Sequence, residues 1–165
     1  MDDAITPLRK PAHRVSERAI TWWTLSAALG WLVPIIAGAV VLLVMDGLPV
    51  LTWAAFGGLV VVAVAHTLVM PRWRYRVHRW EATEDAVYTQ AGWIDQEWRV
   101  APMSRIQTVD TERGPLQQLL GLATVTVTTA SAAGPLHIEG LDLGLAGDLV
   151  RRLTETTQAT PGDAT

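Results

Sequence analysis

The hydrophobic pattern of the chain begins with two long apolar stretches. Thr21–Met45 comprises 25 residues without a charge, and Leu48–Met70 comprises 23 residues in which His66 is the only ionisable side chain. As helices rising about 1.5 Å per residue they would measure roughly 37 and 34 Å, enough to cross a hydrocarbon core of about 30 Å. Residues 46–49, Asp-Gly-Leu-Pro, favour a tight turn between them. The pattern therefore predicts a two-helix transmembrane hairpin over residues 19–71.

Two other interpretations of these stretches fit less well. The first stretch could be a cleaved signal peptide, since Ala37-Gly38-Ala39 resembles a cleavage site. Its apolar run, however, is longer than the usual length of about 7–15 residues, and a second stretch follows at once. Both stretches could instead be buried helices of a soluble bundle, but such helices carry a polar face, and residues 32–44 and 59–65 carry none.

After Pro71 the pattern changes to alternating apolar and polar positions rich in β-favouring residues, which indicates strands. The region ends in an amphipathic stretch from Asp142 to about Thr156, for which we expect a helix with a buried stripe of Leu145, Leu149, Val150 and Leu153. So many short strands followed by one helix favour a strongly bent sheet or partial barrel with a C-terminal capping helix. The expected strands are 73–82, 86–91, one ending near Val100, 106–112, 123–129 and 136–139, with a helical turn at 116–120.

Cationic residues are concentrated beside the apolar stretches. Eight of the 13 Lys and Arg residues lie directly before or after the hairpin, whereas its connecting turn carries only Asp46. Because Lys and Arg favour the cytoplasmic side, both termini, including segment 1–18, are expected in the cytoplasm of a multi-pass plasma-membrane protein. Arginine and tryptophan side chains are expected to anchor the protein at the membrane interface; they are Arg14, Arg18, Trp22, Trp23, Arg72, Trp73, Arg74, Arg76 and Arg79.

The remainder of the chain is acidic, with 5 Arg against 11 Asp and Glu from Thr83 onward. Nucleic-acid binding is therefore disfavoured, because it requires a cationic surface. The chain contains no cysteine, which excludes disulfides and thiolate metal sites. Residues 158–165 are polar and are expected to form a disordered tail.

The segment after the hairpin resembles a known family. The string from Ser104 to Val127, SRIQTVDTERGPLQQLLGLATVTV, is similar in its motifs and their spacing to the YdbS-like bacterial pleckstrin-homology-like (PH-like) membrane proteins. The resemblance implies a mainly-β PH-like barrel with a C-terminal helix over residues 72–157. Within the motif we expect Gln107 and Asp110 to face solvent. Leu116, Leu119 and Leu120 are expected to pack on the barrel.

Eukaryotic PH domains that bind phosphoinositides use basic residues around their first hairpin loop. In this chain the corresponding turn is expected at Thr83-Glu84-Asp85, which is anionic. The lipid bilayer is thus an expected partner through the hairpin, whereas phosphoinositide binding is not expected.

The residues suggest no catalytic chemistry. The four His residues are scattered along the sequence, and no HExxH, GxSxG or phosphate-binding loop occurs. We therefore expect no enzyme activity and no cofactor, and instead a non-catalytic interaction or scaffold module that binds another membrane protein, such as a second PH-like protein.

The alternative function is a subunit of an oligomeric transporter or pore, with His66 as a gate or proton site. His66 could equally reach the inner membrane interface without a function of its own. The spacing of Ser26 with Gly30 and of Ala54 with Gly58 favours close packing within the hairpin over a homodimer interface.

Overall fold

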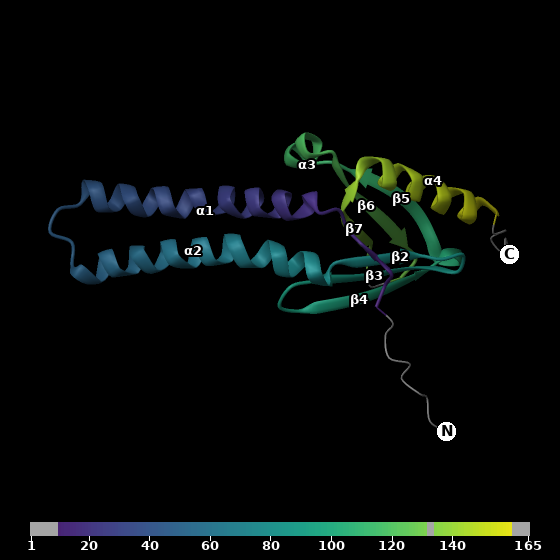
Figure 1. Cartoon of the computed structure of the whole chain (residues 1–165), viewed down its shortest axis with the longest axis horizontal. Helices are drawn as coiled ribbons and strands as arrows, with labels where there is room; N and C mark the ends of the chain where they lie inside the picture. The colour runs from purple at the N-terminus through teal and green to yellow at the C-terminus, as the bar shows by residue number, and fades with distance from the viewer. Residues whose placement is uncertain (1–9, 132–133, 160–165) are drawn as a thin grey trace, which may run out of the picture.

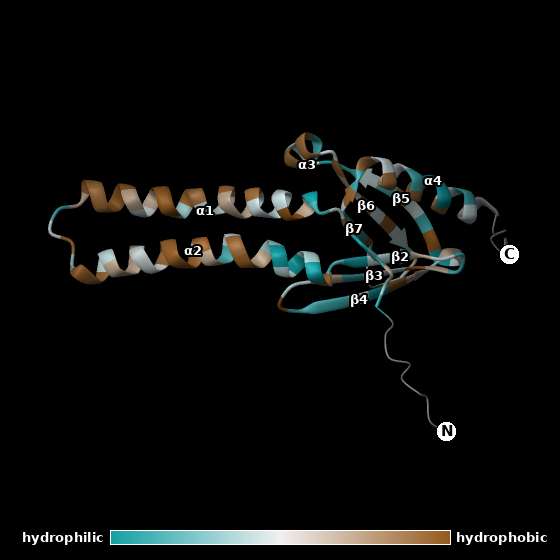
Figure 2. Cartoon of the chain, viewed as in Figure 1, coloured by the Kyte–Doolittle hydropathy of each residue, from teal (hydrophilic) through white to brown (hydrophobic). Residues whose placement is uncertain are grey.

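The computed structural model describes residues 10–131 and 134–159, and its most extended feature is a helical hairpin (Figure 1). Helices α1 (Arg18–Val44) and α2 (Val50–Val77) run antiparallel and project away from the β-rich domain. Both are long and apolar enough to cross a membrane, and their most apolar windows are 0% and 6% buried. Figure 2 shows the hydrophobic colouring along them. Because both helices are exposed, they are not the buried helices of a soluble bundle. Exposed apolar surfaces of this size are normally covered by lipid or by another protein.

Helix α1 approaches the Phe56 ring of α2 closely at Gly38. A Cβ atom at this position would lie 2.7 Å from Phe56 Cδ2, so a larger residue would require the Phe56 side chain to move. Gly30 and Gly58, by contrast, face open space, and Ser26 and Ala54 are exposed. The expectation that these small residues pack inside the hairpin is therefore wrong.

Helix α2 continues through Pro71 to Val77, where the sequence pattern predicted a strand from Trp73 onward. A proline inside a helix removes one backbone hydrogen bond and usually bends or ends the helix. Here the following turn is held by tertiary contacts, because Pro71 and Val77 are buried and Arg74 contacts two other elements. The alternation that suggested a strand thus belongs to a helix lying against the domain.

The domain contains two antiparallel sheets within the described residues. The first has the order β1-β2-β3-β4, and the second has the order β5-β6-β7. The predicted strands after residue 85 are confirmed to within a few residues. The elements are β1 (His13–Arg14), β2 (Arg79–Ala82), β3 (Ala86–Gly92), β4 (Gln96–Pro102), the 3₁₀ turn η1 (Met103–Arg105), β5 (Ile106–Glu112), α3 (Pro115–Leu120), β6 (Leu122–Thr129), β7 (Leu136–Asp142) and α4 (Leu143–Ala159).

The two sheets do not close into a barrel, so the expected barrel is wrong, and the β-rich domain consists of two separate antiparallel sheets. The turn η1 separates β4 from β5, and among residues 10–131 and 134–159 no hydrogen-bonded ladder joins the sheets. Helix α4 packs on β5, β6, β7 and η1, and the start of α1 packs on β7. Side chains from these helices enter the shared core, which explains why the sheets remain apart.

The core lies between the two sheets and extends to the junction between the domain and the hairpin. Val87, Val125 and Leu141 from the sheets are fully buried together with Ala19 of α1 and Leu153 of α4. The expected apolar stripe of α4 is confirmed at Leu149, Val150 and Leu153. Leu145 is instead 43% exposed, and Ala146 takes the buried position beside it.

The expected terminal segments fit the described residues only in part. Within segment 1–18, residues 1–9 lie outside the described part, while His13 and Arg14 pair with β2 and Val15 enters the core. Helix α4 reaches Ala159, and the rest of the expected tail lies outside the described residues.

Candidate functional site

The first candidate site is the neck, where the hairpin joins the domain. Trp23 of α1 is only 2% exposed, and the guanidinium of Arg74 from α2 lies 4.6 Å from its ring centroid. The same guanidinium donates a 2.7 Å hydrogen bond to Glu139 Oε2 of β7. Because Arg74 and Glu139 are both half-buried, this pair is less screened than a surface salt bridge. One arginine therefore ties both helices to the second sheet.

His78 contacts both Trp23 and Arg74. Its ring packs edge-on against Trp23 at 5.0 Å, and its Nδ1 donates a 3.1 Å hydrogen bond to the Arg74 carbonyl oxygen, which can only accept. Burial, and secondarily the positive charge of Arg74, lowers the pKa of His78 to about 4. The imidazole is therefore neutral at physiological pH.

The neck also contains a close backbone approach at Gly140. Its φ is +72°, a left-handed conformation that favours glycine, and a Cβ atom there would lie 2.7 Å from Ala19 Cβ. Its carbonyl oxygen accepts a 2.9 Å hydrogen bond from the Ser16 backbone N–H. The backbone of the second sheet thus lies directly against the Ala19 side chain at the beginning of α1.

The residues predicted to anchor the protein at the membrane fall into three groups. Trp23 and Arg74 are engaged in the neck, so the buried Trp23 ring is not available to lipid, contrary to the expectation for this residue. Arg79 lies in β2 and donates to the Pro11 carbonyl oxygen at 3.4 Å. The others surround the neck, with Trp22 half-buried and the rest exposed; they are Arg14, Arg18, Trp22, Arg72, Trp73 and Arg76.

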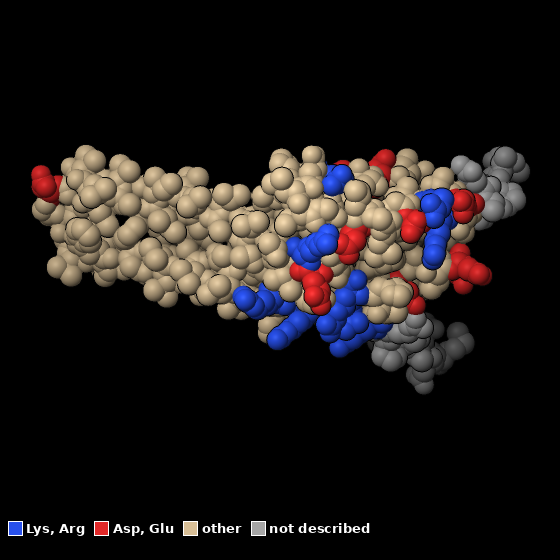
Figure 3. Space-filling view, turned by 45° about the horizontal axis from the view of Figure 1, so that its top comes forward, with Lys and Arg blue, Asp and Glu red and all other residues tan. Residues whose placement is uncertain are grey.

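The charges on the surface of the molecule are also concentrated around the neck. Figure 3 shows cationic side chains gathered where the hairpin meets the domain, and an uncharged surface along the hairpin. Asp46 is the only charged residue between Arg18 and Arg72, and it lies in the turn at the far end. The neck is thus the cationic end of the hairpin.

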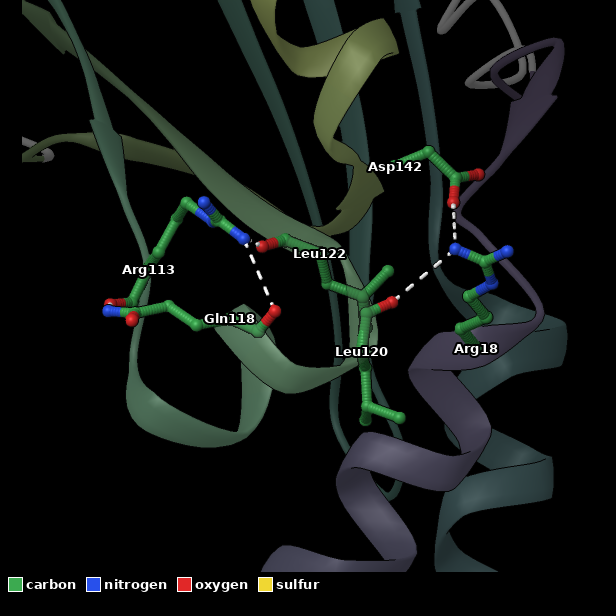
Figure 4. A network of polar contacts seen from close by, with 6 residues as sticks. All are labelled: Arg18, Arg113, Gln118, Leu120, Leu122 and Asp142. Atoms are coloured by element: carbon green, nitrogen blue, oxygen red, sulfur yellow. Dashed lines mark hydrogen bonds and ion pairs between the residues drawn. The ribbon is translucent and has the colours of Figure 1, made fainter.

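Helix α3 is held beside the neck by polar contacts (Figure 4). Arg113 donates from Nε to the Leu122 carbonyl oxygen at 3.1 Å, and from Nη2 to that of Gln118 at 3.4 Å. From α1, Arg18 Nη1 lies 3.5 Å from the Leu120 carbonyl oxygen and 3.8 Å from Asp142. The motif that the family resemblance highlighted therefore builds a braced turn next to α1.

Within that motif the expectations are only partly correct. Gln107 and Asp110 are exposed as predicted, and Leu116 and Leu120 are half-buried. Leu119, which was expected to pack on the domain, is 83% exposed. The buried position belongs to Gln117, whose amide donates to Thr124 Oγ1 at 2.8 Å. Helical spacing alone could not distinguish the two, because α3 spans less than two turns.

The second candidate site is a groove of about 400 Å³ between α4 and the outer edge of the first sheet. Its apolar surface includes Trp80, Met103, Leu145 and Leu149, and acidic side chains lie around it. The turn at Thr83-Glu84 borders this groove, at the end of the domain away from the hairpin (Figure 1). Sequence reasoning missed the groove because the amphipathic pattern assigned Leu145 to the core.

Two of the four histidines, His78 and His137, line one small polar cavity, while His13 and His66 lie apart from it in the described part of the chain. His13 packs on Trp80 at 5.3 Å, and His137 Nδ1 lies 3.1 Å from Thr126 Oγ1. His66 Nδ1 accepts a 3.1 Å hydrogen bond from the Trp31 indole N–H. Among the described residues, no group of three or more His, Asp or Glu side chains could hold a metal ion. A small polar cavity of about 150 Å³ beside Arg74 and His78 is below the usual size of a ligand pocket, roughly 300–1,000 Å³.

The chain belongs to the bacterial PH domain family, because the model of that family matches residues 24–157, well over half of its length. It is also similar to the UPF0699 transmembrane protein YdbS of Bacillus subtilis (strain 168), with 26% identity over 159 residues. That similarity covers 90% of this chain and 96% of the relative. No solved structure matches. The family resemblance seen in the sequence is confirmed, and the chain is a membrane protein with two candidate spans.

Proposed function

We propose that the bacterial PH domain of this chain is a non-catalytic docking module, held at the cytoplasmic face of the plasma membrane by a hairpin whose two ends both lie in the cytoplasm. The orientation is supported by the cationic neck and the single acidic residue at the opposite turn. In this orientation the acidic domain projects into the cytoplasm, with its groove at the end away from the membrane.

The groove beside α4 is the observation that carries the docking role. Its floor is apolar, and its border holds Glu84, Asp148 and Glu155 against Arg152, while Asp148 also pairs with Arg151 at 2.7 Å. An apolar groove with an acidic border suits an amphipathic segment that has one or two apolar anchors flanked by Lys or Arg. We assign this partner to the cytoplasmic segment of another membrane protein, because the hairpin keeps the whole domain, and with it the groove, within one domain length of the membrane.

Leu145 and Leu143 provide a matched test of the docking role. Both belong to α4 and both are 43% exposed, but only Leu145 lines the groove. After crosslinking in native membranes and mild solubilisation, the wild type and Leu143→Asp should recover the same membrane protein, crosslinked through a basic and apolar segment. Leu145→Asp should lose it. Equal recovery by the two variants, or no reproducible partner of the wild type, would refute the docking role.

The orientation is tested separately. A reporter fused after Thr165 should remain protected from protease added to intact cells, and it should become cleavable once the membrane is permeabilised. Cleavage on intact cells would overturn the cytoplasmic assignment and leave only the fold.

The alternative of an oligomeric pore has less support. His66, its expected gate, is hydrogen-bonded through Nδ1 to Trp31 of the same hairpin. An internal bond of this kind fits a role in holding α1 and α2 together.

A further inference from the structure

Two parts of the domain reach back along the hairpin instead of ending at the neck. They are the β3–β4 turn, residues 92–95, and the helix α3, residues 115–120, and together we name them the rim. Figure 1 shows the turn extending beside α2 and α3 lying beside the start of α1. The rim therefore approaches both helices where they leave the domain.

The β3–β4 turn reaches the level of the second span. The Trp93 ring packs edge-on against the ring of His66 at 5.8 Å. His66 precedes Arg72, the first cation after the span, by six residues, which corresponds to about 9 Å along a helix axis. Trp93 is therefore positioned on the hydrocarbon side of the cationic neck, at a depth where membrane proteins place their interfacial tryptophans.

Each part of the rim carries an exposed apolar side chain at its tip, and the β3–β4 turn also carries the exposed carboxylate of Asp95. Ile94 is 75% exposed in the β3–β4 turn, and Leu119 is 83% exposed in α3. Turns of soluble domains normally present Gly, Asn, Asp or Ser at such positions. In Figure 2 α3 carries hydrophobic colour next to α1. Two projecting aliphatic side chains beside two apolar helices favour a common apolar environment.

Both tips are held in place by the fold. Gly92 has a φ of +111°, and a Cβ atom there would overlap the Asp95 carbonyl oxygen, so only glycine permits the tight turn. Helix α3 is held by Arg113 and Arg18 (Figure 4). The exposure of Ile94 and Leu119 is thus built into rigid elements, as expected for a contact surface.

We propose that the rim inserts into the boundary between headgroups and acyl chains of the leaflet in which the hairpin ends. The occupant of this surface is lipid: acyl chains around Trp93, Ile94 and Leu119, and anionic headgroups beside the exposed Arg72 and Arg76. Insertion on both sides of the neck fixes the tilt of the domain, and hence the direction in which its distal end points. The proposal rests on the hairpin crossing the membrane and is independent of the docking groove.

The absence of cysteine allows a direct test. Single-cysteine variants Ile94→Cys, Leu119→Cys and the control Ala130→Cys, which is exposed in the turn after β6, are labelled with a nitroxide. The labelled proteins are placed in nanodiscs of phosphatidylcholine containing phosphatidylglycerol. Collision rates are then measured with oxygen, which partitions into lipid, and with a water-soluble nickel chelate. Matching circular dichroism spectra show that each variant is folded.

The labels at residues 94 and 119 should collide with oxygen several-fold more, relative to nickel, than the label at residue 130. Ratios at both sites equal to that of the control would place the rim in water and overturn the proposal. Low accessibility to both reagents would mean that protein covers the rim, which would overturn it equally. Hydrogen exchange of the unsubstituted protein provides a second measurement, in which residues 92–95 should be protected in nanodiscs relative to the turn at residues 83–85.

Discussion

Adding one methyl group at Gly140 should weaken the packing of β7 on α1. The left-handed φ of +72° costs a non-glycine residue about 1–2 kcal/mol. The contact of the new Cβ atom with Ala19 at 2.7 Å adds about 1–3 kcal/mol of overpacking. The reduced freedom of the unfolded chain recovers about 0.4–1 kcal/mol. We therefore expect Gly140→Ala to lower the free energy of unfolding by about 3 kcal/mol, within limits of about 1 and 5 kcal/mol.

Gly147 supplies a matched control in the same domain. It lies exposed within α4, and a Cβ atom there would meet nothing within 4 Å. Because glycine weakens a helix interior, Gly147→Ala should raise the free energy of unfolding by about 0.5–1 kcal/mol. The same chemical change thus has opposite signs at the two positions.

The assay is thermal unfolding of the purified chain in nanodiscs, followed by circular dichroism in the range dominated by the sheets. At about 4–8 °C per kcal/mol for a domain of this size, Gly140→Ala should lower Tm by roughly 10 °C or more. Gly147→Ala should raise Tm by a few degrees. A Tm of Gly140→Ala within about a degree of the wild type would refute the close packing of β7 on α1.

Two further predictions concern the neck. Arg74→Met removes the charge from both Trp23 and Glu139 and should cost about 1–3 kcal/mol in chemical denaturation. The exposed pair of Arg151 with Asp148 should contribute under about 0.5 kcal/mol, so an Arg151→Met variant that costs as much as Arg74→Met would contradict the assignment. The pKa of His78 falls from its ordinary 6.5 to about 4 on folding, so the unfolded chain takes up the proton first as pH falls. The stability that is present above pH 6.5 should therefore be lost as pH falls toward 4. The full loss is about 3 kcal/mol, measured as the shift in unfolding midpoint with pH; His78→Gln should remove this dependence, and a variant with an unchanged pH profile would assign it to other groups.

Much of the architecture could be predicted from local patterns. The hairpin follows from uninterrupted apolar stretches, and the strands from Ala86 onward follow from β-branched alternation and turn residues. Predictions that depended on which face packs against which element were less successful. Leu119 and Leu145 have apolar spacing that suits a core, yet both are exposed, because Gln117 and Ala146 occupy the buried positions.

The candidate sites could be predicted only in part for the same reason. The cationic flanks of the hairpin are visible in the sequence, and they do surround the neck. The contact between Arg74 and Trp23 is not visible in the sequence, because the two residues come from different helices and Glu139, the carboxylate that binds Arg74, lies far along the chain. The helical state of residues 72–77 likewise depends on those contacts, since local propensity and Pro71 both favoured another structure.

The sequence by itself determined that two segments of this chain are apolar enough to span a membrane and that cations flank their shared end, because hydropathy and charge are properties of each residue alone. Only the tertiary structure decided that the sheets stay open, that β7 contacts α1 through Gly140, and that Ile94 and Leu119 project beside the hairpin. The physical reason is that the exposure of a side chain depends on what folds against it, and those neighbours come from distant parts of the chain.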